Sequence, residues 1–301
     1  MSDTLHSTER RRPKRRLFTF WRVMAVLVVG LLIFNSIRMA PPRGPHVARL
    51  AVTGVIIDDP ARDALIARLG ADGDVRAVIL RIDSPGGTTV GSEALYESLR
   101  ALNKPVVAVM GEAAASGGYI AALAADHLVA RGNTLTGSIG VIAQYPQISG
   151  LMDKLGVEMR IVRSAPLKAA PSPFAPATEA ALAVQRDLIA DSYAWFRGLV
   201  EDRRGLSGPA LDAVSDGRVF TGRLALAAGL IDAIGGEEAA VDWLETTAAI
   251  GPGLPVRDAV VEEAAQSLLK RIIDLVAGGA LMPAGALDRA LMGPRLMSVL
   301  E

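Results

Sequence analysis

Hydrophobic and polar positions follow two alternating periods along most of the chain. Short runs rich in Val and Ile have the length and composition of buried strands, and between them apolar residues recur every three or four positions, as in helices. This alternation predicts an α/β fold. The expected strands span residues 50–57, 77–82, 106–110, 128–130, 141–144 and 160–162. The expected helices span residues 61–69, 90–102, 117–125, 148–155 and 178–203.

The amino-terminal region has the pattern of a membrane anchor. Residues 17–36 are mostly apolar, about the length that crosses a bilayer, and they follow a cluster of Arg and Lys. Because the positive-inside rule keeps such a cluster in the cytoplasm, residues 1–16 are expected to be a cytoplasmic tail and the rest of the chain extracytoplasmic. Residues 37–47 form a Pro-rich linker. A cleavable signal peptide is the alternative, but small residues are poorly placed for cleavage.

Composition narrows the chemistry of the remaining chain. Lys plus Arg and Asp plus Glu each number 32, so the formal net charge is zero and nothing points to nucleic acid. The absence of cysteine excludes disulfides, thiolate catalysis and thiolate metal sites. The three histidines, His6, His46 and His127, are widely scattered and have no metal-ligand spacing. Neither a metal nor a cofactor is expected.

Two glycine-rich turns each follow a predicted buried strand, at residues 83–87 and 115–118. Glycines let backbone N–H groups approach a substrate oxygen, and this is how an oxyanion hole is built. In the second turn Ser116 directly precedes an Ala- and Gly-rich helix, so its hydroxyl is a candidate nucleophile. A simple N-cap is the alternative function of that serine.

A serine nucleophile needs a base, and the sequence offers one histidine and four lysines in the domain and its tail. His127, beside Asp126, leaves a Ser-His-Asp triad open. Lys104, Lys154 and Lys270 have the sequence contexts of ordinary solvated lysines. Lys168 differs, because no carboxylate lies between Glu158 and Glu179, and a lysine in apolar surroundings without a carboxylate is suited to act as a general base. A lysine in a surface loop is the alternative.

Several motifs occur together in the order found in the signal peptide peptidase A family, which the chain resembles over about residues 48–240. Each motif is weak alone, but the combination is specific. They are Asp83-Ser84-Pro85-Gly86-Gly87, Ala114-Ala115-Ser116-Gly117-Gly118-Tyr119, Thr136-Gly137-Ser138-Ile139-Gly140-Val141, Lys154-Leu155-Gly156-Val157, Lys168, Gly217-Arg218-Val219-Phe220-Thr221-Gly222 and Ala227-Ala228-Gly229-Leu230-Ile231-Asp232.

The resemblance implies a role for individual residues. Ser116 would be the acylated nucleophile, Lys168 its general base and Ser138 the residue that orients the lysine. The oxyanion hole would come from the N–H groups of Gly86, Gly87 and Gly117.

The resemblance also implies a fold, an assembly and an activity. The fold would be the repeated β-β-α superhelix of Clp protease and the crotonases, in residues 48–250, and subunits would form a ring or dome. In some family members the serine and the lysine come from neighbouring subunits. The expected function is hydrolysis of remnant signal peptides and other hydrophobic peptides at the outer face of the cytoplasmic membrane. Alternatives are an inactive peptide-binding membrane scaffold, a membrane protease that cuts stomatin-like partners, or a crotonase-type acyl-CoA enzyme.

Two features depart from the family pattern. Relatives usually have glycine three positions before the lysine and an acidic residue just after it, whereas this chain has Ala165 and Ala169. The tail at 251–301 matches nothing in the family. Its amphipathic stretch, 264–276, is expected to pack against the domain or a neighbouring subunit.

Overall fold

The computed structural model describes residues 21, 24, 30 and 44–260. The chain divides into two units, Met1–Gly44 and Pro45–Glu301, and the elements that follow belong to the second. In the described part of the chain, no helix has the length and apolarity needed to cross a membrane. The predicted anchor at 17–36 lies outside the described residues except at three helical positions.

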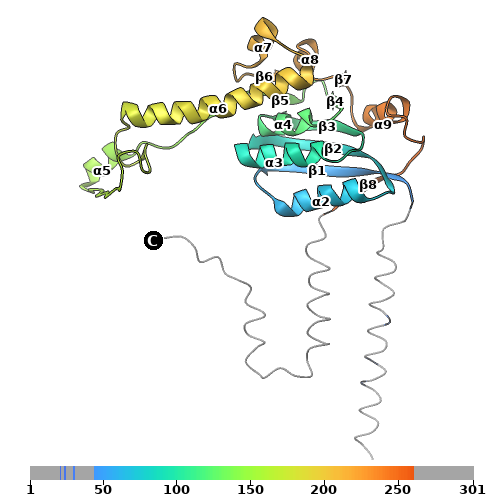
Figure 1. Cartoon of the computed structure of the whole chain (residues 1–301), viewed down its shortest axis with the longest axis horizontal. Coiled ribbons are helices and arrows are strands. Elements are labelled where there is room, and N and C mark those ends of the chain that lie inside the picture. Colours follow the sequence, from blue (N-terminus) through green and yellow to red (C-terminus); the bar gives the residue numbers. More distant parts are fainter. Residues whose placement is uncertain (1–20, 22–23, 25–29, 31–43, 261–301) are drawn as a thin grey trace, which may run out of the picture. The chain divides into compact units, whose positions relative to one another are not determined.

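A sheet of eight strands, most of them parallel, forms the centre of the described fold (Figure 1). Its order is β6-β5-β3-β2-β1-β8, while β4 pairs with β3 and β7, and only β5 and β6 are antiparallel. This mixed α/β fold confirms the predicted class and fits a Clp protease/crotonase-like fold. The strands are β1 (His46–Ile56), β2 (Val75–Gly87), β3 (Val106–Ala115), β4 (His127–Ala130), β5 (Leu135–Gly137), β6 (Val219–Thr221), β7 (Ala233–Ile234) and β8 (Val256–Ala259).

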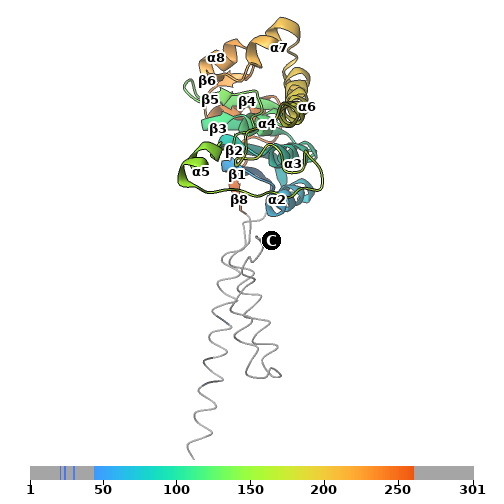
Figure 2. The same cartoon turned by 90° about the vertical axis from the view of Figure 1, so that its left-hand side faces the viewer.

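Helices cover both faces of the sheet because side chains alternate along each strand. In β2, Val78 and Leu80 pack with α2, α3, α4 and α6, whereas Ala77 and Ile79 pack with α9 on the opposite face. Figures 1 and 2 show these layers. The helices are α2 (Pro60–Ala71), α3 (Thr89–Arg100), α4 (Gly117–Leu123), α5 (Ser149–Leu155), α6 (Glu179–Arg204), α7 (Gly208–Val214), α8 (Gly222–Ala227) and α9 (Glu237–Thr246).

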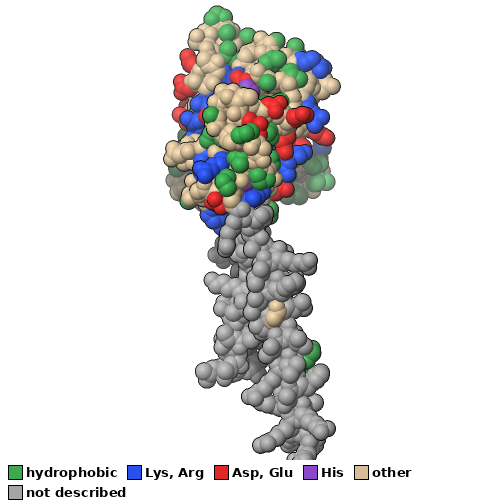
Figure 3. All heavy atoms as spheres, turned by 90° about the vertical axis from the view of Figure 1, so that its right-hand side faces the viewer, with side chains coloured by type: hydrophobic (Ala, Val, Ile, Leu, Met, Phe, Trp, Pro, Cys, Tyr) green, Lys and Arg blue, Asp and Glu red, His purple; other side chains and the backbone are tan. Residues whose placement is uncertain are grey.

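The surface at the α9 end of the sheet mixes both signs of charge. Figure 3 shows acidic and basic side chains interspersed there, as the balanced composition predicts. Arg49 of β1 illustrates the pattern, since it donates to Asp258 of β8 at 2.6 Å and to Glu237 of α9 at 2.8 Å. Strand β8 itself pairs with β1 in parallel, so the sheet extends past the predicted domain end at residue 250.

Two of the predicted strands are wrong. Residues 141–144 and 160–162 form neither strand nor helix in the structure, whereas the other four strands and all five helices were predicted correctly apart from their ends. The incorrect segments contain Val and Ile, which favour strands, but their side chains are exposed: Ile142 is 82% and Val162 is 100% exposed. With no neighbouring strand in the described chain, propensity alone does not make a strand.

These segments belong to a projecting arm, residues 141–178, that precedes the long helix α6. Figure 1 shows α5, the one helix of the arm, beyond the amino-terminal end of α6 and away from α7 and α8. No residue of α5 is buried. Thr178 caps α6, because its Oγ1 accepts the Ala181 N–H at 3.2 Å.

Candidate active site

Ser116 lies between the end of β3 and the start of α4 in a strained backbone conformation. Its φ of +53° and ψ of −120° are unusual for a residue with a side chain, and such strain costs on the order of 1–3 kcal/mol. The conformation is held by the Ser116 N–H, which donates to the Gly137 carbonyl at 2.9 Å, and by the Ser116 carbonyl, which accepts from Tyr119 and Ile120. The hydroxyl makes no capping hydrogen bond, so the N-cap alternative does not describe it.

The turn that ends β2 lies directly against Ser116. A Cβ on Gly86, whose φ is +117°, would come within 2.8 Å of the Ser116 Cβ and 3.1 Å of its Oγ, so only glycine fits there. The Gly87 nitrogen lies 3.1 Å from where a Cβ on Gly117 would stand. Because β2 and β3 are parallel, their carboxyl ends bring these predicted residues together.

One of the predicted N–H donors has a partner already. The Gly86 N–H donates to the Ser84 hydroxyl at 3.1 Å, so it does not face Ser116 as a free donor. The N–H groups of Gly87 and Gly117 are the remaining predicted donors, and both residues line the cavity beside Ser116. Sequence reasoning did not single out Ser84, although it stands within the motif at 83–87.

A cavity of about 310 Å³ opens beside Ser116. Helix α6 supplies Ser192, Trp195 and Phe196, which share one helix face because they are three and four positions apart. In the part of the chain that the structure describes, no charged side chain lines this cavity. The other lining residues are Gly87, Thr88, Thr89, Ser92, Ser116, Gly117, Ile120, Gly140, Val141 and Ile142.

The structure does not bring Lys168 into this cavity. The residue lies on the arm between α5 and α6, its side chain is exposed, and it is not among the lining residues. Its backbone N–H donates to Ala165 at 3.1 Å, and the following residue, Ala169, has a φ of +56°. Within the described residues its amino group has no hydrogen bond or ion pair. Ser138 is nearer, directly after Gly137, whose carbonyl binds the Ser116 N–H.

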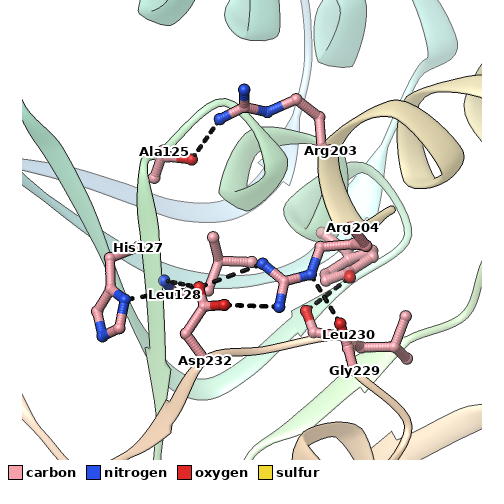
Figure 4. Close-up of polar contacts among 9 residues, drawn as sticks. Ala125, His127, Leu128, Arg203, Arg204, Gly229, Leu230 and Asp232 are labelled. Carbon is pink, nitrogen blue, oxygen red and sulfur yellow. Dashed lines mark hydrogen bonds and ion pairs between the residues drawn. The ribbon is translucent and has the colours of Figure 1, made fainter. Parts of the chain in front are cut away.

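The alternative base, His127, belongs to a structural cluster instead. Its ring stacks on Trp243 at a centroid distance of 4.9 Å, and its Nδ1 lies 3.7 Å from a carboxylate oxygen of Asp232 (Figure 4). Burial lowers the pKa of His127 and outweighs the opposing effect of Asp232. Neighbouring Asp126 accepts the Val106 N–H rather than bonding the ring. The Ser-His-Asp triad is therefore not formed.

Two arginines at the end of α6 fix the elements that carry the site (Figure 4). Arg203 donates to the carbonyls of Leu123 and Ala125, both at 2.8 Å, and so satisfies the carboxyl end of α4. Arg204 binds Asp232 at 2.7 Å. Sequence reasoning missed these contacts because they join segments about eighty and thirty residues apart.

One of the three lysines that were expected to be solvated, Lys104, is half-buried. Its amino group donates to the Val75 carbonyl at 2.7 Å and also to the Asp72 carbonyl, and burial lowers its pKa. These contacts lie at the amino-terminal edge of the sheet, opposite Ser116. No cluster of metal-ligating side chains occurs among residues 44–260 and the three other described positions.

Comparison with known proteins gives the family. The model of peptidase family S49 matches residues 98–251. A putative protease of Synechocystis sp. is 37% identical over 209 residues, which are 68% of this chain and 76% of the relative. Protease 4 of Haemophilus influenzae is 36% identical over 66% of this chain, and a putative signal peptide peptidase SppA of Enterococcus faecium is 31% identical over 66%. The matched regions are 34% and 62% of those two relatives. This chain therefore belongs to peptidase family S49 and is a serine peptidase.

Proposed function

We propose that the chain is a membrane-anchored endopeptidase that cleaves hydrophobic peptides, including remnant signal peptides, through an acyl-enzyme on Ser116. The observation that carries this proposal is the strained Ser116, which makes no capping hydrogen bond and lies in one glycine-rich turn, against the other, at a cavity. A hydroxyl held this way has one face open to a peptide carbonyl. Strain at a residue whose surroundings hold it in place is typical of functional sites.

The chemistry follows from the groups around Ser116. Its oxygen attacks the scissile carbonyl carbon and passes its proton to a base, and the carbonyl oxygen becomes negatively charged. The N–H groups of Gly87 and Gly117 stabilise that oxygen. Gly86 has no side chain and so lets the turn after β2 come close to Ser116. The proton then goes to the leaving amine, and water hydrolyses the acyl-enzyme on Ser116.

The base in this proposal is Lys168 of a second copy of the chain, oriented by Ser138. The exposed position of Lys168 on the arm, outside the cavity of its own chain, supports this arrangement. Large apolar side chains are exposed on the same arm and the adjoining half of α6, including Leu155, Met159 and Leu188. Such a patch marks an interaction surface, and a ring or dome of subunits would cover it.

The substrate class rests on the cavity and on the amino-terminal sequence. The residues around the cavity offer apolar side chains, Trp195 and Phe196 among them, and hydroxyl groups. Peptides with apolar side chains fit this lining best. An anchor at 17–36 would hold the enzyme at the outer face of the cytoplasmic membrane, where cleaved signal peptides arise, with the β-β-α superhelix outside.

The test is cleavage of a hydrophobic signal-peptide substrate by the full chain in detergent. Ser116→Ala and Lys168→Met should each be inactive while folding and assembling normally. Lys154→Met is the matched control, because Lys154 is also exposed on the arm, and it should retain activity. Unchanged cleavage by Ser116→Ala would refute the proposal.

Co-expression tests whether the site is shared. Subunits carrying Ser116→Ala and subunits carrying Lys168→Met are each inactive alone, but a mixed assembly pairs some intact serines with intact lysines. A fraction of wild-type activity should return in mixed assemblies. No recovery in verified mixed assemblies would show that each chain provides its own lysine.

A further inference from the structure

Ser84 is a fully buried residue near the carboxyl end of β2 that the chemistry above does not use. Its hydroxyl donates to the Gly54 carbonyl of β1 at 2.6 Å and accepts the Gly86 N–H at 3.1 Å. Both distances are those of good hydrogen bonds, and a hydroxyl has one donor and two acceptor sites. One side chain therefore links a carbonyl of one strand to an N–H of the turn in the next.

This link stands where the pairing of the strands is irregular. The register of β1 against β2 shifts between Thr53 and Val55, so one residue of β1 faces two of β2. One of those two is Pro85, which has no N–H to donate. Without the hydroxyl, the Gly54 carbonyl and the Gly86 N–H would lose the partner that joins them, and unpaired buried backbone groups are costly.

The link also bears on which N–H of the turn is free to face the nucleophile. The Gly86 N–H is turned toward Ser84, whereas the nitrogen of the next residue, Gly87, lies beside Gly117, and both glycines line the cavity with Ser116. The Ser84 carbonyl lies 2.8 Å from where a Cβ on Gly118 would stand, so the same residue also packs against the first turn of α4.

We propose that Ser84 is a positioning residue that sets the orientation of the oxyanion-hole turn, an inference that rests on the function proposed for Ser116. Its hydroxyl fixes the peptide group before Gly86, and the Gly87 N–H is aimed at the developing oxyanion as a consequence. An oxyanion-hole donor acts mainly in the transition state, and losing one costs roughly 100- to 1,000-fold in kcat. A misdirected donor should cost less, about 10- to 100-fold.

The test compares Ser84→Ala with Thr134→Val in the full chain. Thr134 is a matched control: it is also buried, and its hydroxyl donates to the Gly111 carbonyl at 2.7 Å and accepts the Arg131 N–H at 3.1 Å. Ser84→Ala should lower kcat by about 10- to 100-fold with KM little changed, whereas Thr134→Val should change neither. Thermal unfolding of both variants measures how much each hydroxyl contributes to the stability of the fold.

A pair of inhibitors separates positioning from general damage. A peptide aldehyde forms a tetrahedral adduct that needs the oxyanion hole, and the matching peptide alcohol does not. Ser84→Ala should weaken the binding of the aldehyde by the same factor by which it lowers kcat. The binding of the alcohol should be unchanged. If Ser84→Ala does not fold, Ser84→Cys, which keeps a weak donor, replaces it. This variant should lose less of kcat and less of the affinity for the aldehyde.

Two outcomes would overturn the inference: wild-type kcat in the folded variant, or equal weakening of aldehyde and alcohol. Failure of the proposed function looks different, because Ser116→Ala would then cleave the substrate. If Ser116→Ala is inactive and Ser84→Ala has wild-type kcat, only the role of Ser84 is wrong.

Discussion

At the scale of single residues, the site depends on how closely two backbone turns approach each other. Gly86 and Ser116 are in contact, with no room for another atom between them. The sequence predicted this group because its members belong to short local motifs after buried strands. It did not predict that the Gly86 N–H donates to Ser84. That hydrogen bond depends on an irregular strand register, which no pattern of residues in the sequence indicates.

Gly86→Ala tests this close approach. The added Cβ would stand 2.8 Å from the Ser116 Cβ, at a φ of +117° that alanine rarely adopts. We expect at least about a 100-fold loss of kcat/KM and a loss of roughly 1–3 kcal/mol in the free energy of unfolding. Peptide cleavage and denaturant unfolding measure the two effects.

Gly198→Ala is the control for that substitution. Gly198 lies inside α6, and a Cβ there would meet nothing within 4 Å. Alanine should therefore raise the free energy of unfolding by about 0.5–1 kcal/mol, because it restricts the unfolded chain and favours the helix. Equal effects of the two substitutions would show that the contact between Gly86 and Ser116 is unimportant.

At the scale of elements, α6 connects the cavity to the rest of the fold. Its middle lines the cavity through Trp195 and Phe196, and its end is fixed by Arg203 and Arg204. Local pattern predicted the helix itself almost to its ends. It could not predict where the helix lies, because that is set by carbonyls and carboxylates from distant segments.

Arg204→Ala should release this end of the helix. Burial alone would raise the pKa of Asp232, but the hydrogen bonds from Arg204 and from the Leu128 N–H lower it below its usual value. The ion pair therefore stabilises the fold above the pKa that Asp232 has in the unfolded chain, and its contribution is lost as the pH falls through the lower folded value. At neutral pH we expect a loss of about 1–3 kcal/mol in the free energy of unfolding.

Urea unfolding at several pH values checks this prediction. The difference between wild type and Arg204→Ala should shrink as acid protonates Asp232, and a difference that stays constant would contradict it. Arg197→Ala is the control on the same helix. Arg197 pairs with Asp212 in a more exposed position, so its removal should have little effect at any pH.

At the scale of the whole molecule, the incorrect predictions from the sequence fall on the arm. Its Val and Ile residues were mistaken for two strands, and its lysine was expected beside the serine. In the described chain the arm has neither a strand partner nor a buried helix. The proposed assembly would account for both properties, because contacts of the arm with a second copy of the chain are information that one sequence does not contain.

Leu188→Glu should therefore weaken assembly. Leu188 is 66% exposed on the half of α6 that adjoins the arm, and a carboxylate there would be costly to bury between subunits. Sedimentation should show smaller species with reduced peptidase activity and normal unfolding. Leu224→Glu is the control, because Leu224 is 58% exposed on α8, away from the arm, and its assembly should be unchanged. Wild-type assembly of Leu188→Glu would argue against a contact at this surface.

In the proposed mechanism Ser116 is the nucleophile and Lys168 activates it. The most direct measurement is to treat the active enzyme with an alkyl fluorophosphonate and to locate the modified serine by mass spectrometry. We expect an adduct on Ser116 that forms as activity is lost and that forms much more slowly in Lys168→Met. An adduct on a different serine, formed as activity is lost while Ser116 stays unmodified, would contradict it.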